Sequence, residues 1–340
     1  MSYDVAVMGA TGAVGRVMLE ILAERDFPVR ELRLLASSRS AGKKIDYRGE
    51  SLTVQELTAD SFAGIDLVLS SAGGSLSRRF APAAVEAGAV VVDNTSAFRM
   101  DPEVPLVVPE VNPGDLDDHR GIVANPNCST IIMVVPLWPL HRSHRVRRVI
   151  VSTYQAISGA GAPAMEELVE QTRDVLHDRP AVPRELPYPI AFNLFSHNTE
   201  IDADGYCEEE VKMIRETRKM FHEESILVSP TCVRVPILRA HSEAMTVEFE
   251  EPVSEAEVRE ILGGAPGVSL VDDRETNHFP MPLEASGRDE VLVGRIRQDL
   301  SRPDGTSVSM FLCGDQLRKG AALNAVQIAE ALAADGRLGS

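Results

Sequence analysis

The chain has 340 residues, enough for about two domains, and its 44% hydrophobic and 25% charged residues are typical of a globular protein that folds without disulfides or metals. Acidic residues outnumber basic ones by 51 to 34, and the net charge of −17 excludes nucleic acids and anionic membrane surfaces as expected partners, although a local group of basic residues can still bind a small anion. No basic region precedes the first apolar run, and the four cysteines form no CxxC pair. We therefore expect a cytoplasmic protein with free thiols and no metal site.

Strands and helices alternate in the first third of the chain, beginning with a β-rich segment at the N-terminus. This alternation predicts parallel βαβ units with right-handed crossovers. The predicted elements are, in order, strand Tyr3–Met8, helix Val14–Leu22, strands Glu31–Ala36 and Asp66–Ser71 with helix Leu76–Glu86 after them, and strand Val90–Val92.

The pattern changes near Pro126, after which long extended segments predominate and predict a mixed or antiparallel sheet. Because the amphipathic last helix should pack back on the first domain, we predict an α/β chain with a Rossmann-type parallel-sheet domain of residues 1–127 plus 317–340 and an α+β mixed-sheet domain of residues 128–316. The predicted strands are Arg147–Gln155, Thr231–Val235, Ala244–Glu250, Val291–Arg297 and Thr306–Leu312, and the predicted helices are Ser129–Leu140, Pro163–Leu176, Glu208–Phe221 and Arg318–Ala333.

Three glycines stand three residues apart between the first predicted strand and the first helix, at Gly9, Gly12 and Gly15. Small residues at this point let a pyrophosphate approach the free N–H groups of a helix N-terminus. The spacing is GxxGxxG, not the GxGxxG of the usual fingerprint, and a plain tight turn is the simpler alternative. The strand–turn–helix context favours nucleotide binding.

The end of the second predicted strand carries the residues that should distinguish the two nicotinamide cofactors. NAD-binding folds place an acid there to hold the ribose hydroxyls, whereas this chain has Ser37-Ser38-Arg39-Ser40. A guanidinium among hydroxyls suits a 2′-phosphate, so we predict NADP, the alternative being a solvated basic turn. The small residues Ser71-Ala72-Gly73 follow the third strand, where the cofactor would cross the sheet edge.

Cys128 opens a predicted helix in the segment Asn125-Pro126-Asn127-Cys128-Ser129-Thr130. A helix N-terminus favours the thiolate, which is the nucleophilic form of cysteine. Most cysteines are small buried hydrophobes, and we interpret Cys207, Cys232 and Cys313 in that way. Cys128 is the candidate nucleophile.

A cysteine nucleophile needs a base, and three histidines are candidates: His241, His197 and His278. Arg234 lies seven residues before His241, and strand alternation alone would point the two to opposite faces. A shared site therefore requires a bend, which Pro236 allows.

Six ordered motifs make the chain resemble aspartate-β-semialdehyde dehydrogenases over essentially its whole length. These enzymes are a homodimeric branch of the cysteine-dependent phosphorylating aldehyde dehydrogenases, so the resemblance implies a homodimer whose mixed-sheet domain serves catalysis and dimerisation. The motifs are Gly9-Ala10-Thr11-Gly12-Ala13-Val14-Gly15, Ser71-Ala72-Gly73-Gly74-Ser75, Asn125-Pro126-Asn127-Cys128-Ser129-Thr130, Gln155-Ala156-Ile157-Ser158-Gly159-Ala160-Gly161, Arg234-Val235-Pro236 with His241, and Leu317-Arg318-Lys319-Gly320-Ala321-Ala322-Leu323-Asn324.

The resemblance implies a role for each matching residue. Cys128 would be the nucleophile, His241 the acid/base and Gln155 the group that orients the substrate or polarises the acyl intermediate. Arg234 would bind the α-carboxylate and Glu209 the amino group, where the run Glu208, Glu209, Glu210 leaves the register open by one residue. The phosphate would be bound by Arg99, Asn127 and Lys212, and NADP by Gly9, Thr11, Gly12, Ala13, Val14, Gly15, Ser37, Ser38, Arg39, Ser40, Ser71, Ala72, Gly73, Ser158, Gly159, Gly161 and Asn324. From the residues alone, Glu209 and Lys212 are equally compatible with a surface ion pair.

The implied reaction is the NADPH-dependent reduction of L-aspartyl-4-phosphate to L-aspartate-4-semialdehyde through a Cys128 thioester, a step toward lysine, threonine and methionine. N-acetyl-γ-glutamyl-phosphate reductase, a related enzyme, is the nearest alternative. Asn127 argues against it, because that family typically has Gly before the cysteine. A non-catalytic Rossmann-type paralogue should lack the nucleophile or its base, and a cysteine hydrolase would need no nucleotide motif.

Overall fold

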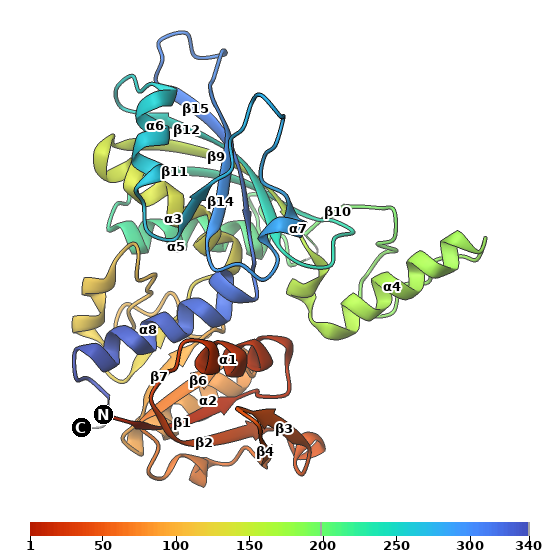
Figure 1. Ribbon diagram of the computed structural model, residues 1–340, viewed down its shortest axis with the longest axis vertical. Coiled ribbons are helices and arrows are strands. Elements are labelled where there is room, and N and C mark those ends of the chain that lie inside the picture. Colours follow the sequence, from red (N-terminus) through yellow and green to blue (C-terminus); the bar gives the residue numbers. More distant parts are fainter. Residues whose placement is uncertain (198, 339–340) are drawn as a thin grey trace. The chain divides into compact units, whose positions relative to one another are not determined.

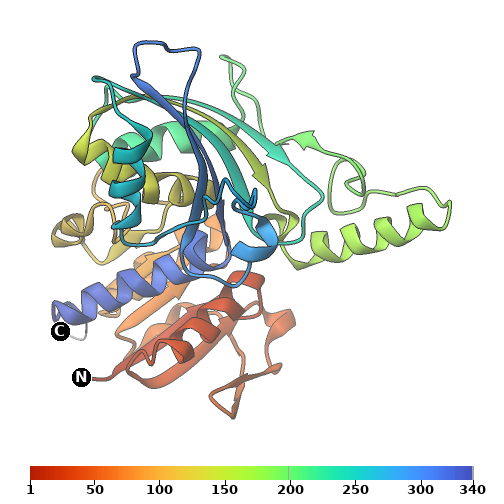
Figure 2. The same cartoon turned by 45° about the horizontal axis from the view of Figure 1, so that its top comes forward.

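The computed structural model describes residues 1–197 and 199–338, and the chain divides into two compact units. The first comprises Met1–Asn127 and Ala321–Ser340, and the second comprises Cys128–Gly320. Residues 317–320, expected in the first domain, are grouped with the second unit, and residues 339–340 of the expected domain lie outside the described part. Each unit has its own sheet (Figures 1 and 2).

The first unit contains a six-stranded sheet in the order β5-β2-β1-β6-β7-β8, and every neighbouring pair is parallel. The predicted Rossmann-type parallel sheet is thus confirmed. The C-terminal helix α8 packs against α1, β6 and β7. The elements are β1 Tyr3–Met8, α1 Ala13–Glu24, β2 Val29–Ala36, the hairpin β3 Lys44–Tyr47 and β4 Glu50–Thr53, β5 Gln55–Glu56, β6 Leu67–Ser70, α2 Gly74–Glu86, β7 Val90–Asp93, β8 Ile122–Ala124 and α8 Leu323–Ala334.

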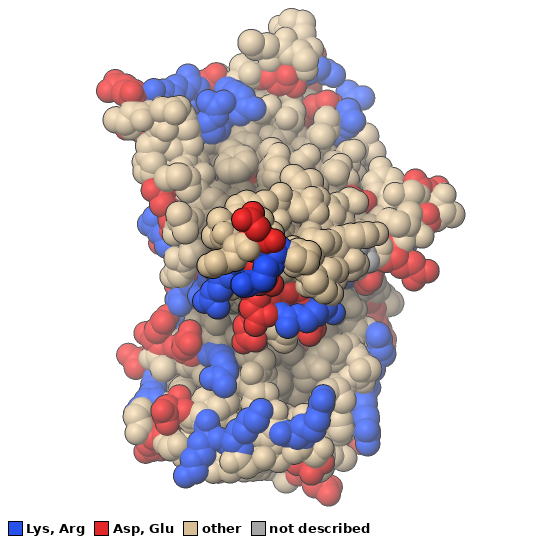
Figure 3. Space-filling view, turned by 90° about the vertical axis from the view of Figure 1, so that its right-hand side faces the viewer, with Lys and Arg blue, Asp and Glu red and all other residues tan. Residues whose placement is uncertain are grey.

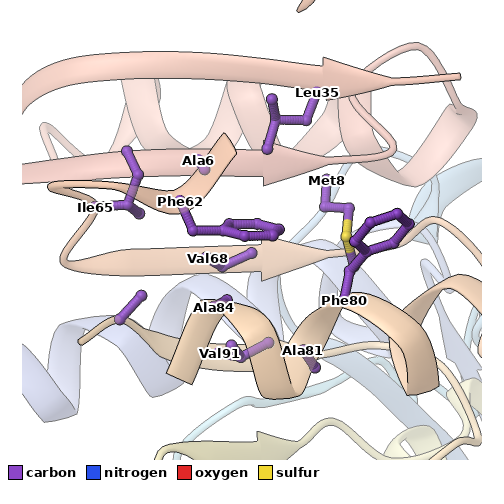
Figure 4. Packing of buried hydrophobic residues seen from close by; sticks show 11 residues of the cluster. Ala6, Met8, Leu35, Phe62, Ile65, Val68, Phe80, Ala81, Ala84 and Val91 are labelled. Carbon is purple, nitrogen blue, oxygen red and sulfur yellow. The ribbon is translucent and has the colours of Figure 1, made fainter. Parts of the chain in front are cut away.

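Buried apolar side chains between this sheet and α2 hold the unit together (Figure 4). Phe62 lies against the strands beside Ala6 and Val68, and Phe80 extends from α2 toward Met8. Full burial of each large side chain stabilises the fold by about 1.5–3 kcal/mol. This packing fixes the carboxyl ends of β1 and β6, from which the glycine-rich segments start.

The second unit contains a seven-stranded sheet in the order β10-β11-β9-β12-β15-β14-β13. It has both parallel and antiparallel pairs, so the predicted mixed sheet is confirmed. Helix α3 packs against α5 and against α6, and all three helices contact strands of this sheet, whereas α4 extends outward from the sheet (Figures 1 and 2). The strands are β9 Val146–Gln155, β10 Phe195–Ser196, β11 Leu227–Arg234, β12 His241–Phe249, β13 Val268–Leu270, β14 Val291–Gln298 and β15 Ser307–Gly314, and the helices are α3 Cys128–Ser143, α4 Ala162–Leu176, α5 Glu208–Phe221, α6 Glu255–Gly263 and α7 Pro282–Ala285.

Helix α3 continues past its predicted end at Leu140 to Ser143 and includes Pro136 and Pro139. A proline inside a helix costs about 3 kcal/mol because it removes a backbone hydrogen bond. Most of α3 is buried, so its packing outweighs this cost. Other boundaries also differ from the prediction. For example, β11 begins at Leu227 and not at Thr231, β12 begins at His241 and not at Ala244, and a π-helical turn, Arg318–Ala322, precedes α8.

Candidate active site

Cys128 is the first residue of α3, and its thiol is partly accessible. Its Sγ lies 3.5 Å from Nε2 of His241. Gly320 packs close to the thiol, since a Cβ on that glycine would lie 3.0 Å from Cβ of Cys128. The second unit thus places a cysteine at a helix N-terminus beside an imidazole, an arrangement that supports a nucleophilic thiolate.

His241 is fully buried, and the backbone N–H of Ala156 donates to its Nδ1 at 3.0 Å. A backbone amide can only donate, so Nδ1 accepts, and the neutral ring carries its proton on Nε2, the nitrogen that faces Cys128. Burial, with a smaller effect from Arg234, lowers the pKa of His241 to about 3. The ring is therefore neutral at physiological pH and presents an N–H to the thiol.

Arg234, Gln155 and His241 form one row across three neighbouring strands. Arg234 pairs with Gln155 across β11 and β9, and the pairing of Ser242 with Tyr154 places His241 beside Gln155. All three side chains are buried. The chain leaves β11 at Arg234 and enters β12 at His241, so Pro236 lies in the connection between two strands. The bend that a shared site required is present.

The guanidinium of Arg234 is held from two sides. Its Nη1 donates to the carbonyl oxygen of Ala156 at 2.9 Å, and its Nη2 lies 3.0 Å from Nε2 of His197. Its buried Nε has no hydrogen-bond partner among the described residues. Arg234 also lies next to His241, because a Cβ on Gly159 would be 3.2 Å from Nη1 of Arg234 and 3.3 Å from Cε1 of His241.

The structure distinguishes the three consecutive glutamates at the start of α5. Glu209 is buried, accepts a hydrogen bond from Nε2 of Gln155 at 3.1 Å, and lies 3.5 Å from Nζ of Lys212. Glu208 is more exposed and pairs with Lys212 at 3.0 Å. Glu210 accepts from the backbone N–H groups of Cys207 and Cys232, so it anchors the helix. Among the three, Glu209 is the one bound to the row.

Several residues that support the site carried no recognisable pattern in the sequence. The Nε2 of Gln316 donates to Oγ of Ser158, and its Oε1 accepts from the backbone N–H of Ala240 at 2.9 Å. Ala240 has a φ of 71°, a strained conformation for a residue with a Cβ, and it immediately precedes His241. Gln316 thus ties the Ser158 loop to the turn that leads into β12.

Of the other two histidine candidates, His197 contacts Arg234, as described above. His278 is exposed and pairs with Glu284 at 2.7 Å, on residues that take no part in the row.

The glycine-rich turn of the first unit is built by close backbone contact. Gly9 has a φ of +91°, and a Cβ on it would lie 2.9 Å from the backbone of Ser71. A Cβ on Gly15 would lie 2.3 Å from the carbonyl oxygen of Gly9. Gly12 is the N-cap of α1 and provides no side-chain cap, and the first turn, which contains Ala13 and Val14, has no acidic residue. Thr11, Ala72 and Gly73 lie in the same two loops.

These features fit a phosphate group. The N-terminus of α1 is available to an anion, and the buried Oγ of Ser71 has no hydrogen-bond partner among the described residues. Ser37, Ser38 and Arg39 are exposed directly after β2, followed by the half-buried Ser40. The predicted 2′-phosphate contacts are therefore accessible from solvent.

Other predicted residues of the first unit are held by internal contacts. Asn324 is fully buried, and its Nδ2 donates to the carbonyl oxygen of Val107 at 2.9 Å and to Oδ1 of Asn125 at 2.6 Å. Arg99 donates from Nε to the carbonyl oxygen of Asn125 and from Nη2 to that of Asn94. Asn127 is buried at the end of the unit. The predicted phosphate ligands are thus divided, with Arg99 and Asn127 in the first unit and Lys212 in the second.

The other three cysteines of the second unit are buried, whereas Cys128 is partly accessible. Burial raises the pKa of Cys313 to about 12 and raises that of Cys207 and Cys232 as well. These three cysteines are buried core residues, as interpreted from the sequence. Glu243, two residues after His241, is fully buried, and neither of its carboxyl oxygens has a hydrogen-bond partner among the described residues.

The surface mixes the two signs of charge, and basic and acidic side chains are interspersed over the face drawn in Figure 3. The net charge of −17 therefore does not create a uniformly acidic surface. Within residues 1–197 and 199–338, no group of three or more His, Cys, Asp or Glu is arranged to hold a metal ion, and no helix is long and apolar enough to span a membrane.

Two family models match the chain: the NAD binding domain of semialdehyde dehydrogenases over residues 4–119 and their dimerisation domain over residues 137–319. The aspartate-semialdehyde dehydrogenase of Synechocystis sp. is 58% identical over 334 residues, 98% of each chain. This chain belongs to the aspartate-semialdehyde dehydrogenase family.

Solved structures of the family agree with the fold. The crystal structure of aspartate semialdehyde dehydrogenase II from Vibrio cholerae complexed with ASA has a TM-score of 0.95 at 45% identity, over 98% of this chain and 99% of that one. A Candida albicans aspartate semialdehyde dehydrogenase solved with NADP has a TM-score of 0.77 at 26% identity, over 99% of this chain and 100% of that one. The family resemblance expected from the sequence motifs is confirmed.

Proposed function

We propose that the chain reduces L-aspartyl-4-phosphate to L-aspartate-4-semialdehyde with NADPH, through a thioester on Cys128. The observation that carries this proposal is the approach of the Cys128 Sγ to Nε2 of His241 at 3.5 Å, beside the buried row of Arg234 and Gln155. The names of the relatives and the ASA-bound structure from Vibrio cholerae support the same substrate. The reaction is a step toward lysine, threonine and methionine.

The first step needs a thiolate and produces phosphate. The Cys128 thiolate, favoured by the N-terminus of α3, attacks the acyl carbon, and the carbon–oxygen bond to phosphate breaks with its electron pair on the leaving oxygen. Arg99, Asn127 and Lys212 would bind the departing phosphate.

The second step converts the thioester into the aldehyde and returns the thiolate. NADPH, when bound, supplies the hydride. The Nε2–H of His241 faces Cys128, where the reaction takes place. It would donate a hydrogen bond to the reacting oxygen and stabilise the negative charge that develops there. Cleavage of the carbon–sulfur bond then releases the aldehyde and restores the Cys128 thiolate. Because this step needs no net proton transfer, the neutral imidazole of His241 can serve as the hydrogen-bond donor.

The α-carboxylate and the ammonium group of the substrate would each be bound by a side chain of opposite charge. Arg234, with its buried Nε free of described partners, would bind the α-carboxylate in a bidentate pair. Glu209 would accept the ammonium group, and Gln155, already bonded to Glu209, would orient the acyl group. A free ammonium is the feature that separates this substrate from its N-acetylated relative.

The residues of the first unit fit a dinucleotide phosphate. The glycine turn admits no Cβ at Gly9 or Gly15, and the unpartnered Oγ of Ser71 offers a hydrogen bond. NADP is preferred over NAD in this proposal because Arg39 and its neighbouring serines stand where an acid would hold the ribose. Ser158, Gly159, Gly161 and Asn324 are proposed to serve the nicotinamide half, Asn324 by holding the backbone around it.

We also propose that the enzyme is a cytoplasmic homodimer. The match to a dimerisation domain over residues 137–319 supports the dimer, and four free cysteines suit a reducing compartment. Size-exclusion chromatography with light scattering tests the assembly, and a monomer at working concentration would refute it.

The decisive assay follows the reduction of NADP⁺ by L-aspartate semialdehyde, with and without phosphate, at the nicotinamide absorbance. NAD⁺ and N-acetylglutamate semialdehyde are run in parallel. Turnover that requires phosphate and favours NADP⁺ is expected. Turnover of the acetylated substrate alone would identify the related reductase, and NADP binding without any turnover would identify a non-catalytic paralogue.

A further inference from the structure

His197 lies just beyond β10, outside the set of residues assigned to the reaction. Its backbone N–H donates to the carbonyl oxygen of Cys232 at 2.8 Å, which continues the antiparallel pairing of β10 with β11. This backbone bond brings the imidazole alongside Arg234, the last residue of β11.

The donor and the acceptor of the contact between His197 and Arg234 can be assigned in only one way. A guanidinium has donors and no acceptor, so at 3.0 Å the Nη2 of Arg234 donates and Nε2 of His197 accepts. The imidazole is then neutral, with its proton on Nδ1. That nitrogen lies 3.4 Å from Oγ1 of Thr199, which can accept a hydrogen bond from it.

Thr199 extends this connection to the second substrate-reading residue. Its Oγ1 also accepts a hydrogen bond from the backbone N–H of Glu209 at 3.4 Å. A path of hydrogen bonds therefore runs from Arg234 through His197 and Thr199 to the first turn of α5. Arg234 and Glu209, the proposed ligands of the α-carboxylate and the ammonium group, are therefore both connected to the segment that contains His197 and Thr199.

We propose that His197 is a positioning residue that, as a neutral hydrogen-bond acceptor, fixes the guanidinium of Arg234 for the substrate carboxylate. With Nη1 bound to Ala156 and Nη2 to His197, the plane of the guanidinium is set, and its unpartnered Nε is left for a side-on bidentate pair. The assignment of the carboxylate rests on the proposed function.

Protonation of His197 would abolish this support, because Nε2 would become a donor facing another donor. The charged or titratable groups around the ring are Arg234 on β11, His241 on β12, and Glu209, Glu210 and Lys212 on α5. Burial, opposed by the attraction of Glu209, lowers the pKa of His197 below its usual 6.5. The acceptor is therefore intact at neutral pH and is lost in acid.

The test compares His197→Leu, which removes the acceptor, with His197→Gln, whose Oε1 can occupy the place of Nε2. For His197→Leu, the KM for aspartate semialdehyde should rise about 10- to 100-fold, the loss expected for a hydrogen bond to a charged group. Its kcat, its KM for phosphate and its Kd for NADP should change little. His197→Gln should recover most of the lost affinity, and its KM should not show the acidic rise of the unmutated enzyme. His278→Leu, at the exposed histidine, is the matched control and should leave all constants unchanged.

A fall in kcat with an unchanged KM, or no rescue by glutamine, would overturn the positioning role. Thermal unfolding separates these results from a folding defect. Nitrogen NMR of ¹⁵N-histidine-labelled protein tests the bond without turnover: a neutral Nδ1–H ring at pH 7 that changes in Arg234→Leu is expected, and an Nε2–H ring would refute the proposal. If the unmutated protein does not use aspartate semialdehyde, the proposed function fails, whereas the NMR result still decides whether His197 holds Arg234.

Discussion

The glycine turn of the first unit and the row of Arg234, Gln155 and His241 in the second unit are held in place by different kinds of contact. In the turn, backbone segments pack directly against each other, and a Cβ added to Gly15 would lie 2.3 Å from the carbonyl oxygen of Gly9. In the row, β9, β11 and β12 contribute buried side chains, and those of His241 and Arg234 are both hydrogen-bonded to the backbone of Ala156. Substitutions in the turn should therefore act through sterics and affect stability and cofactor binding together. Substitutions in the row should remove chemistry and leave the cofactor bound.

The largest effect is expected at Cys128, the proposed nucleophile. Cys128→Ala should lower kcat on the order of 10⁴-fold or more, since no other group can form the thioester, while the Kd for NADP stays within about twofold. Steady-state kinetics and a fluorescence titration measure the two quantities. Cys313→Ala, at a buried thiol, should retain turnover. Comparable losses in both variants would mean that Cys128 is structural.

The converse experiment is Gly15→Ala in the first unit. The clash with the carbonyl oxygen of Gly9 should cost about 1–3 kcal/mol of stability and weaken NADP binding at the same time. Gly114→Ala is the matched control, because a Cβ there meets no atom within 4 Å. Denaturant unfolding and NADP titration report the outcome. If Gly15→Ala bound NADP normally at unchanged stability, the backbone contact would not be needed.

A smaller effect is expected at the surface of the first unit. Arg39→Ala should weaken NADP binding about tenfold, the equivalent of 1.4 kcal/mol, because an exposed guanidinium loses part of its attraction for phosphate to solvent. The Kd for NAD should not change, as NAD lacks the 2′-phosphate. Equal weakening of both cofactors would place Arg39 elsewhere than at the 2′-phosphate.

The smallest effect concerns Glu243, which lies two residues after His241 on the same face of β12. Burial raises its pKa well above the usual 4.5, so the folded state keeps a proton that the unfolded chain releases. Its contribution to stability is therefore complete below pH 4.5 and falls as the pH rises toward the folded value. Glu243→Met should stabilise the protein by about 1 kcal/mol at pH 8 and less at pH 5.

Urea unfolding at the two pH values measures this difference. Glu248→Gln, which removes a carboxylate from the more exposed face of the same strand, is the control variant. The difference in free energy of unfolding between Glu243→Met and the unmutated protein should be larger at pH 8 than at pH 5. An equal difference at both pH values would contradict a buried Glu243 that is protonated in the folded state.

The parallel sheet and the glycine turn were predictable because both depend on local pattern. Apolar runs alternate with amphipathic helices, and a strand, a turn and a helix follow one another within the first 24 residues. The elements missed, such as the hairpin β3–β4 and helix α6, are short and carry few apolar residues. The extension of α3 through Pro136 was also missed, since burial outweighs propensity there.

The row of the second unit was only partly predictable. Cys128 stood out through its polar, helix-opening context, but the choice among three histidines needed the register of β12 against β9. The contacts of His197 and Gln316 could not be predicted, because each depends on residues far away in sequence that the sheet brings together. The motifs of a known family supplied what local physical reasoning could not.

The pairing of Tyr154 with Ser242 has a consequence for the production and engineering of the enzyme. If β12 slipped by one residue, His241 would turn to the opposite face of the sheet, and a slip of two would bring Glu243 to the place of the imidazole. Such a molecule would keep nearly all of its secondary structure and a nucleotide domain able to bind its ligand. Circular dichroism and cofactor affinity would not distinguish this misregistered molecule from the native one. Specific activity is therefore the assay that shows whether β12 has paired in the correct register.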